Sequence, residues 1–389
     1  MCSDITCAIG KVAQGTLKKG GFVALVDEDR VVGNYKAQKL YTSVGLAREE
    51  VEEVETGDII ALAGIAELTI GQTVTDPAYP KSLPKITVEE PTIKVTVSPN
   101  TSPLSGREGK LCSSAQIKGR LIKEKEINLG LRVEEDPRSS NFTVCGRGEL
   151  HLSILFETMR REGFEFEVSK PQVIYKTIDG IICEPFEEVT IDVGNDFVGI
   201  ITAEMGKRKG EMADMKGEGT FTRFVYKISS QNLLGIRNSL LTKTRGTATL
   251  SPYFLGYFKA GAKMESKRNG AVIATQSGTS LSFGLANAQE RGTLFIGPGE
   301  DVYEGMVVGI SNRSDDLEIN VCKAKKQTNV RSETADIAIQ ITPATKLALE
   351  QALDFVGEDE LLEITPKNLR LRKKYLSNTR RKVMERREG

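Results

Sequence analysis

The chain has 389 residues, with 53 Lys and Arg against 53 Asp and Glu, so its formal net charge is zero. This length exceeds what one hydrophobic core usually serves, and we expect two to four domains. A hydrophobic fraction of 39% excludes a disordered chain. The neutral total excludes a net field that would by itself draw the protein to nucleic acid, so the distribution of charge matters more than its sum.

Cysteine and histidine usage argues against a metal site. The six cysteines include no C-x-x-C pair, and the chain has one histidine, His151. A zinc site and a disulfide framework are both disfavoured, and reduced thiols are the simple interpretation. The sequence has no charged-then-apolar leader and no apolar run of about 18 residues that could span a bilayer. We therefore expect a cytoplasmic protein with no membrane partner.

Residues 1–80 are predicted to form a small, partial β-barrel. Apolar and polar residues alternate from about residue 8 to residue 76 with frequent glycine, and a turn is indicated at Gly20 and Gly21. Several short strands at turn-bounded spacing are typical of such a barrel. Three prolines within "DPAYPKSLP" then indicate a linker.

Residues 88–170 are predicted to form a ferredoxin-like domain. A strand is expected at 91–97, a helix at 106–126, two strands, a helix at 148–163 and a final strand. The order β-α-β-β-α-β is that of the split βαβ fold. The same order recurs in residues 171–260, with a helix expected over "QNLLGIRNSLLTKTRG" (231–246).

Residues 261–389 are predicted to form a different, strand-rich domain of mixed type. An amphipathic helix is expected at 343–361, followed by a basic tail. The predicted fold class is thus α+β and multidomain, with a small β-barrel, two tandem ferredoxin-like domains and a mixed C-terminal domain containing a helix.

The segment "CGRGELHLSIL" holds the single histidine, and we interpret it as structural. His151 falls in the first turns of the helix expected at 148–163, where Leu150, Ile154 and Leu155 supply an apolar stripe. Glu149 near the helix N-terminus suits the helix dipole. A catalytic role is the weaker alternative, because no nucleophile or partner is marked by a motif around it.

Phosphate-binding and metal-binding patterns are not found in the sequence. The P-loop pattern G-x-x-x-x-G-K-[ST] does not occur, and Leu111 follows Gly109 and Lys110 where Ser or Thr would hold magnesium. The acidic clusters at 48–55 and 357–361 are most simply solvated faces or caps, with a metal or paired-carboxylate role as the lesser alternative. We predict no catalytic residue, no metal site and no cofactor in this chain.

Basic residues give the stronger functional signal. "CKAKKQTNVR" interleaves polar residues with cations, and a second basic run covers the tail from Arg370 to Arg387. Either run alone is as easily a solvated face, but two in one domain of a neutral protein favour phosphate contact. The nucleic-acid contacts predicted from these runs are Lys323, Lys325, Lys326, Asn329, Arg331, Arg372, Lys373 and Lys374. Arg313 and Arg237 join this set only through the family resemblance given below.

The chain resembles a known family over essentially its whole length. "GRGELHLSILFETMRREGFEFEVSKPQVIYK" resembles the third domain of translational GTPases of the elongation factor G group, and "EPFEEVTIDV…GKRKGEM…GIRNSLLTKTRGTA" resembles their fifth. "ERGTLFIGPGEDVYEGMVVGISNRSDDLEINVCKAKKQTNVR" and "ALEQALDFVGEDELLEITPKNLRLRKKYL" are similar to the C-terminal domain of the TypA/BipA family.

This resemblance implies a ribosome-bound factor in large-subunit assembly and in stress or cold adaptation. The family's C-terminal loop reaches toward the peptidyl-transferase centre and the acceptor end of tRNA. It corresponds here to "NVCKAKKQTNVR", with "NRSDDL" (312–317) as a neighbouring motif. The implied partners are the large subunit, its rRNA and tRNA, with the protein itself a monomer.

The sequence also departs from the family pattern. The GTPase domain, with its GTP and Mg²⁺, is expected to be missing from this chain, so GTP hydrolysis is not assigned to it. "QNLLGIR" (231–237) lacks the first arginine of the usual R-G-L-I-G-F-R, although Arg237 is kept. Two alternatives to a ribosome-binding module stay open: an enzyme whose nucleotide site a partner chain completes, and a fragment without independent activity.

Overall fold

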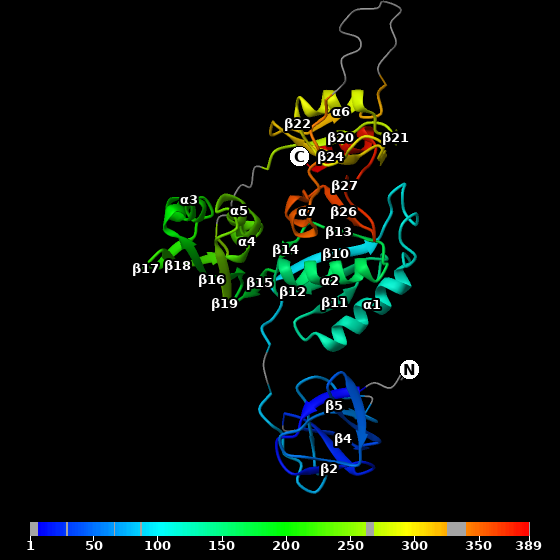
Figure 1. Ribbon diagram of the computed structural model, residues 1–389, viewed down its shortest axis with the longest axis vertical. Coiled ribbons are helices and arrows are strands. Elements are labelled where there is room, and N and C mark those ends of the chain that lie inside the picture. Colours follow the sequence, from blue (N-terminus) through cyan, green and yellow to red (C-terminus); the bar gives the residue numbers. More distant parts are fainter. Residues whose placement is uncertain are drawn as a thin grey trace, which may run out of the picture. The chain divides into compact units, whose positions relative to one another are not determined.

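Figure 1 shows the computed structural model of the chain, which describes residues 7–28, 30–65, 67–85, 88–261, 268–324 and 340–388, except the side chains of Glu385 and Glu388. The chain divides into two compact units. The first comprises Met1–Val88 and Glu126–Leu129, and the second comprises Glu89–Lys125 and Gly130–Gly389. Helices and strands are both abundant along the chain, which confirms the predicted α+β class.

The first unit is built from short strands around its own core. Val23, Leu25, Leu40 and Leu62 are among the buried apolar side chains. The strands pair as β1-β8-β5-β6, β4-β3-β9 and β2-β7, so the described strands form three sheets that do not close into one barrel; the expectation was of a partial barrel. The strands are β1 (Cys7–Lys11), β2 (Thr16–Lys18), β3 (Phe22–Asp27), β4 (Arg30–Lys36), β5 (Lys39–Val44), β6 (Ala47–Val51), β7 (Glu53–Glu55), β8 (Ile59–Ala63) and β9 (Thr73–Thr75).

The second unit begins with the predicted β-α-β-β-α-β order. Its strands pair in the order β11-β12-β10-β13, with β14 also on β10, which is the interleaved arrangement of a ferredoxin-like sheet. The elements are β10 (Ile93–Pro99), α1 (Ser114–Ile127), β11 (Arg132–Glu135), β12 (Phe142–Gly146), α2 (Glu149–Arg161), β13 (Phe166–Ser169) and β14 (Gln172–Val173).

Helix α1 begins eight residues later than its sequence spacing predicts. The carboxylate of Glu165 accepts hydrogen bonds from the backbone N–H groups of Gly106 and Gly109, each at 2.8 Å, and this holds the preceding residues in turns. Ser113 and Gln116 then form a reciprocal cap, in which each side chain accepts from the other's backbone N–H at 3.1–3.3 Å. The helix therefore begins where its free N–H groups find a partner.

The same element order recurs between residues 181 and 259. The strands pair as β15-β16-β18-β17, with β19 on β16. The helix expected over 231–246 is broken, because Gly235 adopts a φ of +69°, a left-handed conformation that glycine tolerates best. The elements are β15 (Lys176–Ile178), β16 (Ile181–Gly194), the 3-10 turn Asn195–Phe197, α3 (Val198–Lys207), β17 (Glu211–Glu218), β18 (Phe221–Ser229), α4 (Ser230–Leu233), α5 (Ile236–Lys243) and β19 (Thr249–Lys259).

The C-terminal region contains two helices that the sequence reasoning missed, α6 and α8. The helix expected at 343–361 is shorter than predicted: it begins only at Leu349 and ends at Phe355, and residues from Glu360 onward form a strand. The elements are β20 (Ala271–Ala274), β21 (Gly278–Thr279), α6 (Ser282–Gln289), β22 (Gly292–Leu294), β23 (Asp301–Val302), β24 (Met306–Ser311), β25 (Leu317–Ile319), α7 (Leu349–Phe355), β26 (Glu360–Ile364), β27 (Leu369–Lys373) and α8 (Asn378–Glu388).

One sheet runs through the first ferredoxin-like domain and the C-terminal region. Strand β13 pairs antiparallel with β26, in the register Phe166↔Ile364 to Ser169↔Leu361. The sheet path is therefore β11-β12-β10-β13-β26-β27-β24-β20-β25 (Figure 1). The predicted domains 88–170 and 261–389 share this sheet and one continuous hydrophobic core, in which Phe166 and Val168 lie with Leu362 and Ile364.

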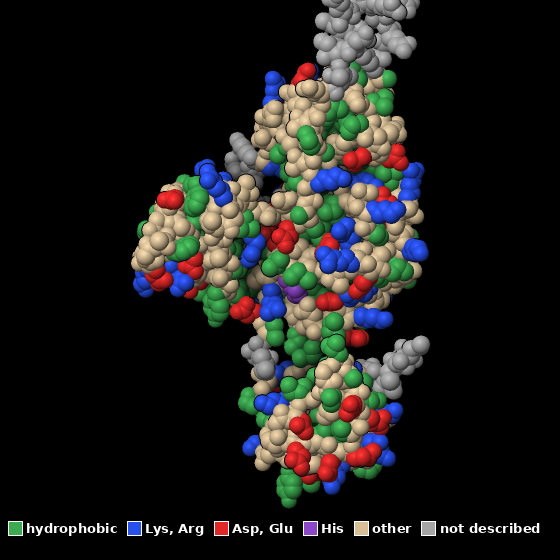
Figure 2. All heavy atoms as spheres, in the orientation of Figure 1, with side chains coloured by type: hydrophobic (Ala, Val, Ile, Leu, Met, Phe, Trp, Pro, Cys, Tyr) green, Lys and Arg blue, Asp and Glu red, His purple; other side chains and the backbone are tan. Residues whose placement is uncertain are grey.

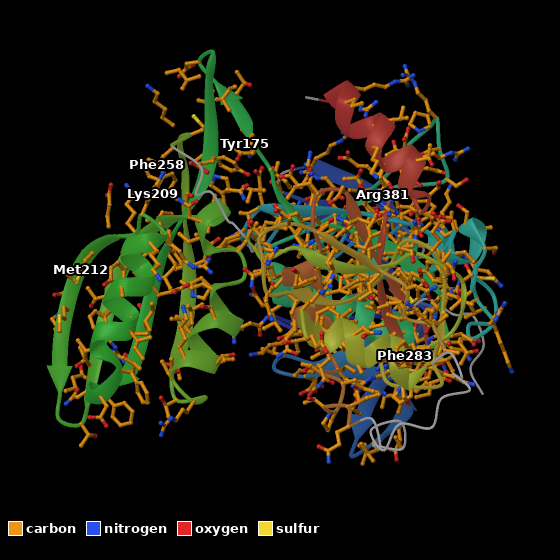
Figure 3. The ribbon with its side chains drawn as sticks, turned by 90° about the horizontal axis from the view of Figure 1, so that it is seen from above. Tyr175, Lys209, Met212, Phe258, Phe283 and Arg381 are labelled. Carbon is orange, nitrogen blue, oxygen red and sulfur yellow. The ribbon has the colours of Figure 1, made fainter. Side chains whose placement is uncertain are left out.

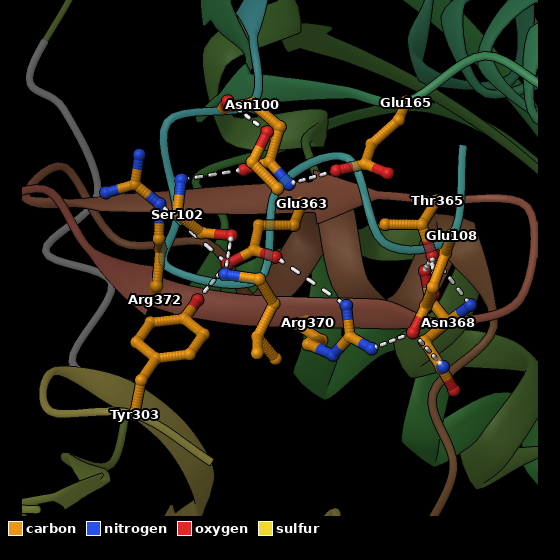
Figure 4. Close-up of polar contacts among 12 residues, drawn as sticks. Asn100, Ser102, Glu108, Glu165, Tyr303, Glu363, Thr365, Asn368, Arg370 and Arg372 are labelled. Carbon is orange, nitrogen blue, oxygen red and sulfur yellow. Dashed lines mark hydrogen bonds and ion pairs between the residues drawn. The ribbon is translucent and has the colours of Figure 1, made fainter. Parts of the chain in front are cut away.

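A buried ionic network holds this junction together (Figure 4). The Arg372 guanidinium lies 2.5 Å from the Glu167 carboxylate and 2.6 Å from the Thr101 hydroxyl oxygen. Glu363 accepts a hydrogen bond from the Tyr303 hydroxyl, and burial raises the pKa of Glu363 to about 7. Arg370 pairs with Glu108 at the other end of the network. The two strands of the C-terminal hairpin are thus fixed by charge as well as by backbone pairing.

Replacing Arg372 with Met should lower the free energy of unfolding by about 3 kcal/mol, because Glu167 would be left as a buried charge without its cation. Denaturant unfolding of the purified chain measures this. The adjacent Lys374 is exposed and serves as the matched control, for which Lys374→Met should change stability by less than about 0.5 kcal/mol. Equal effects of the two substitutions would contradict the network's role.

A second buried contact joins the sheet of β15–β19 to α2 and α7. Glu149, at the start of α2, accepts hydrogen bonds from the Gly235 N–H at 3.1 and 3.2 Å. Asp354 of α7 accepts from the Asn238 side chain and also meets Glu149. Burial and the neighbouring Asp354 raise the pKa of Glu149 to about 8. The pair therefore holds a proton at neutral pH.

This proton makes stability depend on pH through a buried contact. The folded chain binds the Glu149 proton up to about pH 8, whereas the unfolded chain loses it near pH 4.3. Stability should therefore fall as pH rises between these values, with a slope of up to about 1.4 kcal/mol per pH unit.

Glu149→Gln should remove that slope, because the amide keeps the hydrogen bonds and carries no titrating proton. Melting temperatures at several pH values between 5 and 8 measure the effect. The melting temperature of the variant, relative to that of the wild type, should rise toward pH 8. Glu211→Gln, on the exposed strand β17, is the control and should melt in parallel with the wild type. Parallel curves for Glu149→Gln as well would show that Glu149 does not carry the titrating proton.

Candidate nucleic-acid interface

Lys323 lies just beyond the edge strand β25 and is exposed. The segment before it is fixed to the fold: β25 pairs in parallel with β20, and Asn320 donates to Gln276 at 2.8 Å and accepts from the Cys322 N–H at 2.9 Å. Lys323 thus projects from a rigid support. The other predicted contacts of this loop, Lys325, Lys326, Asn329 and Arg331, lie outside the described residues.

Arg313 is also exposed, in the turn between β24 and β25. Its carbonyl accepts from the Gly270 N–H at 2.8 Å, and Asp316 in the same turn accepts from the Ala271 N–H at 2.7 Å. A Cβ atom on Gly270 would lie 2.0 Å from the Asp315 carbonyl oxygen, so only glycine allows this close approach. The "NRSDDL" motif is therefore held in one conformation with Arg313 on the surface.

The predicted contacts Arg372 and Lys373 are placed in the interior. Each is 3% exposed. Lys373 forms ion pairs with Asp316 at 2.6 Å, Asp359 at 2.7 Å and Glu360 at 3.1 Å. Burial alone would lower the pKa of Lys373, but these carboxylates outweigh it and raise the pKa to about 12. Both cations bind carboxylates of the fold, and the next residue, Lys374, is the exposed one.

Arg237 lies apart from the other predicted contacts. It belongs to α5, in the region of the five-stranded sheet, where it is half-buried and donates to the Leu250 carbonyl oxygen at 3.4 Å. The structure therefore does not place Arg237 on the sheet that carries Arg313, Lys323 and Lys374.

Charge on the visible face of the second unit is mixed. Figure 2 shows Lys and Arg side chains interspersed with Asp and Glu, without a large area of one sign. This agrees with the zero net charge of the sequence. Contact with a polyanion would therefore depend on small local groups of cations and not on a long-range field.

Four further exposed cations lie on α8, a helix within the segment that the sequence analysis described as a basic tail. They are Arg380, Lys382, Arg386 and Arg387. The segment has no apolar stripe of the kind that marks most helices, so its sequence did not indicate one.

His151 takes part in local structure. Its Nδ1 accepts from the Arg147 N–H at 3.3 Å, and burial lowers its pKa. These contacts fit the structural interpretation of "GRGELHL". Among the described residues, no three His, Cys, Asp or Glu side chains are grouped to hold a metal ion. The helices in the same part of the chain are all too short or too polar to cross a membrane.

Three family models match successive parts of the chain. Residues 6–75 match elongation factor Tu domain 2, residues 181–268 match the elongation factor G C-terminus, and residues 269–378 match the TypA/BipA C-terminal domain. The last of these covers strands β20–β27, the part of the sheet that carries Arg313 and Lys323.

Curated relatives match nearly the whole chain. Proteins named large ribosomal subunit assembly factor BipA are 44% identical over 366 residues in Synechocystis sp., 43% over 379 in Buchnera aphidicola and 42% over 376 in Bacillus subtilis. These alignments cover 94%, 97% and 96% of this chain, which spans about three fifths of the length of the relatives, namely 61%, 62% and 61%. The chain belongs to the TypA/BipA family.

Proposed function

We propose that this chain is the ribosome-binding portion of a TypA/BipA-type translational GTPase that acts in assembly of the large ribosomal subunit, in stress or cold. The observation that carries the proposal is the 42–44% identity, over 94–97% of the chain, to relatives named as large-subunit assembly factors. Similarity at this level along almost every element favours a shared partner.

The exposed cations of the C-terminal region are the proposed RNA contacts. Arg313, Lys323 and Lys374 are exposed on turns and strand ends of one sheet. Lys and Arg side chains on a rigid support contact phosphates without reading base sequence, so recognition would depend on the shape of the RNA. We propose that the loop from Lys323 to Arg331 contacts rRNA and the acceptor end of tRNA. Arg372 and Lys373 are left out, because both are already bound to carboxylates.

No step of GTP hydrolysis is assigned to these residues. The 389-residue sequence has no G-x-x-x-x-G-K-[ST] pattern, so the residues at hand do not fit a GTP–Mg²⁺ site. We propose that nucleotide binding belongs to a GTPase domain outside this sequence and biases how these domains engage the ribosome.

Replacing Lys323, Lys325 and Lys326 together with Ala should weaken binding to large subunits and flatten its salt dependence. Each lost phosphate contact reduces the slope of log K against log salt by about 0.7–0.9. Co-sedimentation of the purified chain with separated ribosomal subunits across a salt series measures both quantities.

The matched control replaces three exposed lysines of the first unit, Lys11, Lys36 and Lys81, with Ala. Its salt slope should stay closer to that of the wild type than the slope of the loop variant does. An unchanged affinity and slope for the loop variant would reject the loop as the contact. If the wild-type chain fails to sediment with any subunit at low salt, the proposed function itself is rejected for this chain.

A further inference from the structure

Helix α8 is held to the protein without a hydrophobic face. Its eleven residues include five Lys and Arg against two Glu, and the described side chain that it buries most deeply is Arg381, 8% exposed. Val383 is 45% exposed. A helix of this length is marginal alone, and helices in proteins usually gain their stability from an apolar face. The structure must therefore supply another reason for this helix to be ordered.

That reason is an ionic anchor in its first turn. The Arg381 guanidinium lies 2.6 Å from Glu318 of β25 and also donates to the Tyr375 and Leu376 carbonyl oxygens. Asn378 donates from its side chain to Glu318, and its backbone N–H donates to Glu304 at 3.2 Å. Figure 3 shows Arg381 on α8, with side chains of the helix projecting away from the rest of the unit.

The remaining four cations flank the outer side of the helix. At 100° per residue, Val383 lies nearly opposite the anchor Arg381. Lys382 and Arg386 fall on one side of Val383, and Arg380 and Arg387 fall on the other. All four cations are exposed. Among the five cations of α8, Arg381 is the one that forms an ion pair within the described residues. The anchored helix therefore presents two rows of positive charge along one outward face.

We propose that α8 is a second RNA-binding element, which lies along a groove of double-stranded rRNA with one row of cations on the phosphates of each strand. The inference rests on the proposed function and names a further contact within it. Arginine suits this partner, because its guanidinium binds phosphate oxygens in pairs.

A membrane surface fits the helix less well. Interfacial helices insert a broad apolar face, whereas the outward face of α8 offers Val383 alone among its cations. Two separated rows match the two phosphate backbones of a duplex better than they match one acidic peptide strand. The anchor at Glu318 adds to this, because it holds the helix axis in place before binding and reduces the entropy lost on binding.

The test compares the full chain with a variant in which Arg380, Lys382, Arg386 and Arg387 are all replaced by Gln. The matched control replaces the same number of exposed cations in the first unit: Lys11, Lys36, Arg48 and Lys81, all to Gln. The probes are a fluorescent RNA hairpin with a duplex of about 16 base pairs, roughly the span that a double-stranded RNA-binding domain covers, a single strand of equal length, and purified large subunits. Circular dichroism and melting temperature check that each variant is folded.

We expect the α8 variant to bind the duplex at least about tenfold more weakly at low salt, with a salt slope smaller by roughly 2–4, while the control changes much less. A Glu318→Gln substitution removes the anchor but no surface cation, and it should weaken duplex binding in the same direction by a smaller factor.

Equal losses for the α8 variant and the control would overturn the inference, since charge alone would then explain binding. An α8 variant that keeps its duplex affinity but loses the large subunit would also overturn it, since the contact would then be with ribosomal protein. Failure of the wild-type chain to bind large subunits, together with a duplex affinity that depends on α8, would instead reject the proposed function and keep the RNA-binding helix.

Discussion

The pairing of β13 with β26 is the constraint on which the rest of the second unit depends. It makes one sheet out of two regions that are about 200 residues apart in sequence, and it brings Arg372 onto Glu167 in the interior. A buried ion pair of this kind adds little to stability compared with two apolar side chains in its place, but either partner left alone is a buried unpaired charge, and a misaligned register would leave the carboxylate so. The ionic network therefore specifies register. The correct register in turn sets where β24, β20 and β25 lie, and so where Arg313 and Lys323 reach the surface.

Local sequence patterns predicted the elements of the two ferredoxin-like domains well, but they did not predict the long-range pairing of strands. The two β-α-β-β-α-β orders could be inferred because each strand and helix follows its own periodicity, and helix α2 lies within one residue or two of its predicted bounds. The sharing of a sheet between predicted domains could not be inferred, since backbone pairing leaves no signature in either strand alone. The late start of α1 has a similar cause: the Glu165 carboxylate that holds Gly106 and Gly109 comes from more than 50 residues away.

The candidate interface was predictable in kind but not residue by residue. Sequence does not separate the exposed cations Lys323 and Lys374 from the buried cations Arg372 and Lys373, because all four belong to basic runs. What separates them is which carboxylates the fold brings near. Strand β27 lies between β26 and β24, so both of its edges are paired. Asp316 from the turn before β25, and Asp359 and Glu360 from the start of β26, neutralise Lys373. A count of basic residues therefore overstates the charge that such a segment shows to solvent.

Helix α8 differs from β27, because most of its cations stay exposed. Strand β27 and helix α8 together explain how a neutral protein can be suited to bind RNA. The cations Arg372 and Lys373 of β27 form internal ion pairs, and one cation of α8, Arg381, anchors that helix through an ion pair. The four other cations of α8 remain exposed on an outward face. Neutrality of the whole chain limits non-specific attraction to any polyanion, since the long-range field is small. Binding then requires that phosphates meet the exposed cations where the sheet and the Glu318 anchor hold them, so that the geometry of the RNA, and not its charge alone, decides what is bound.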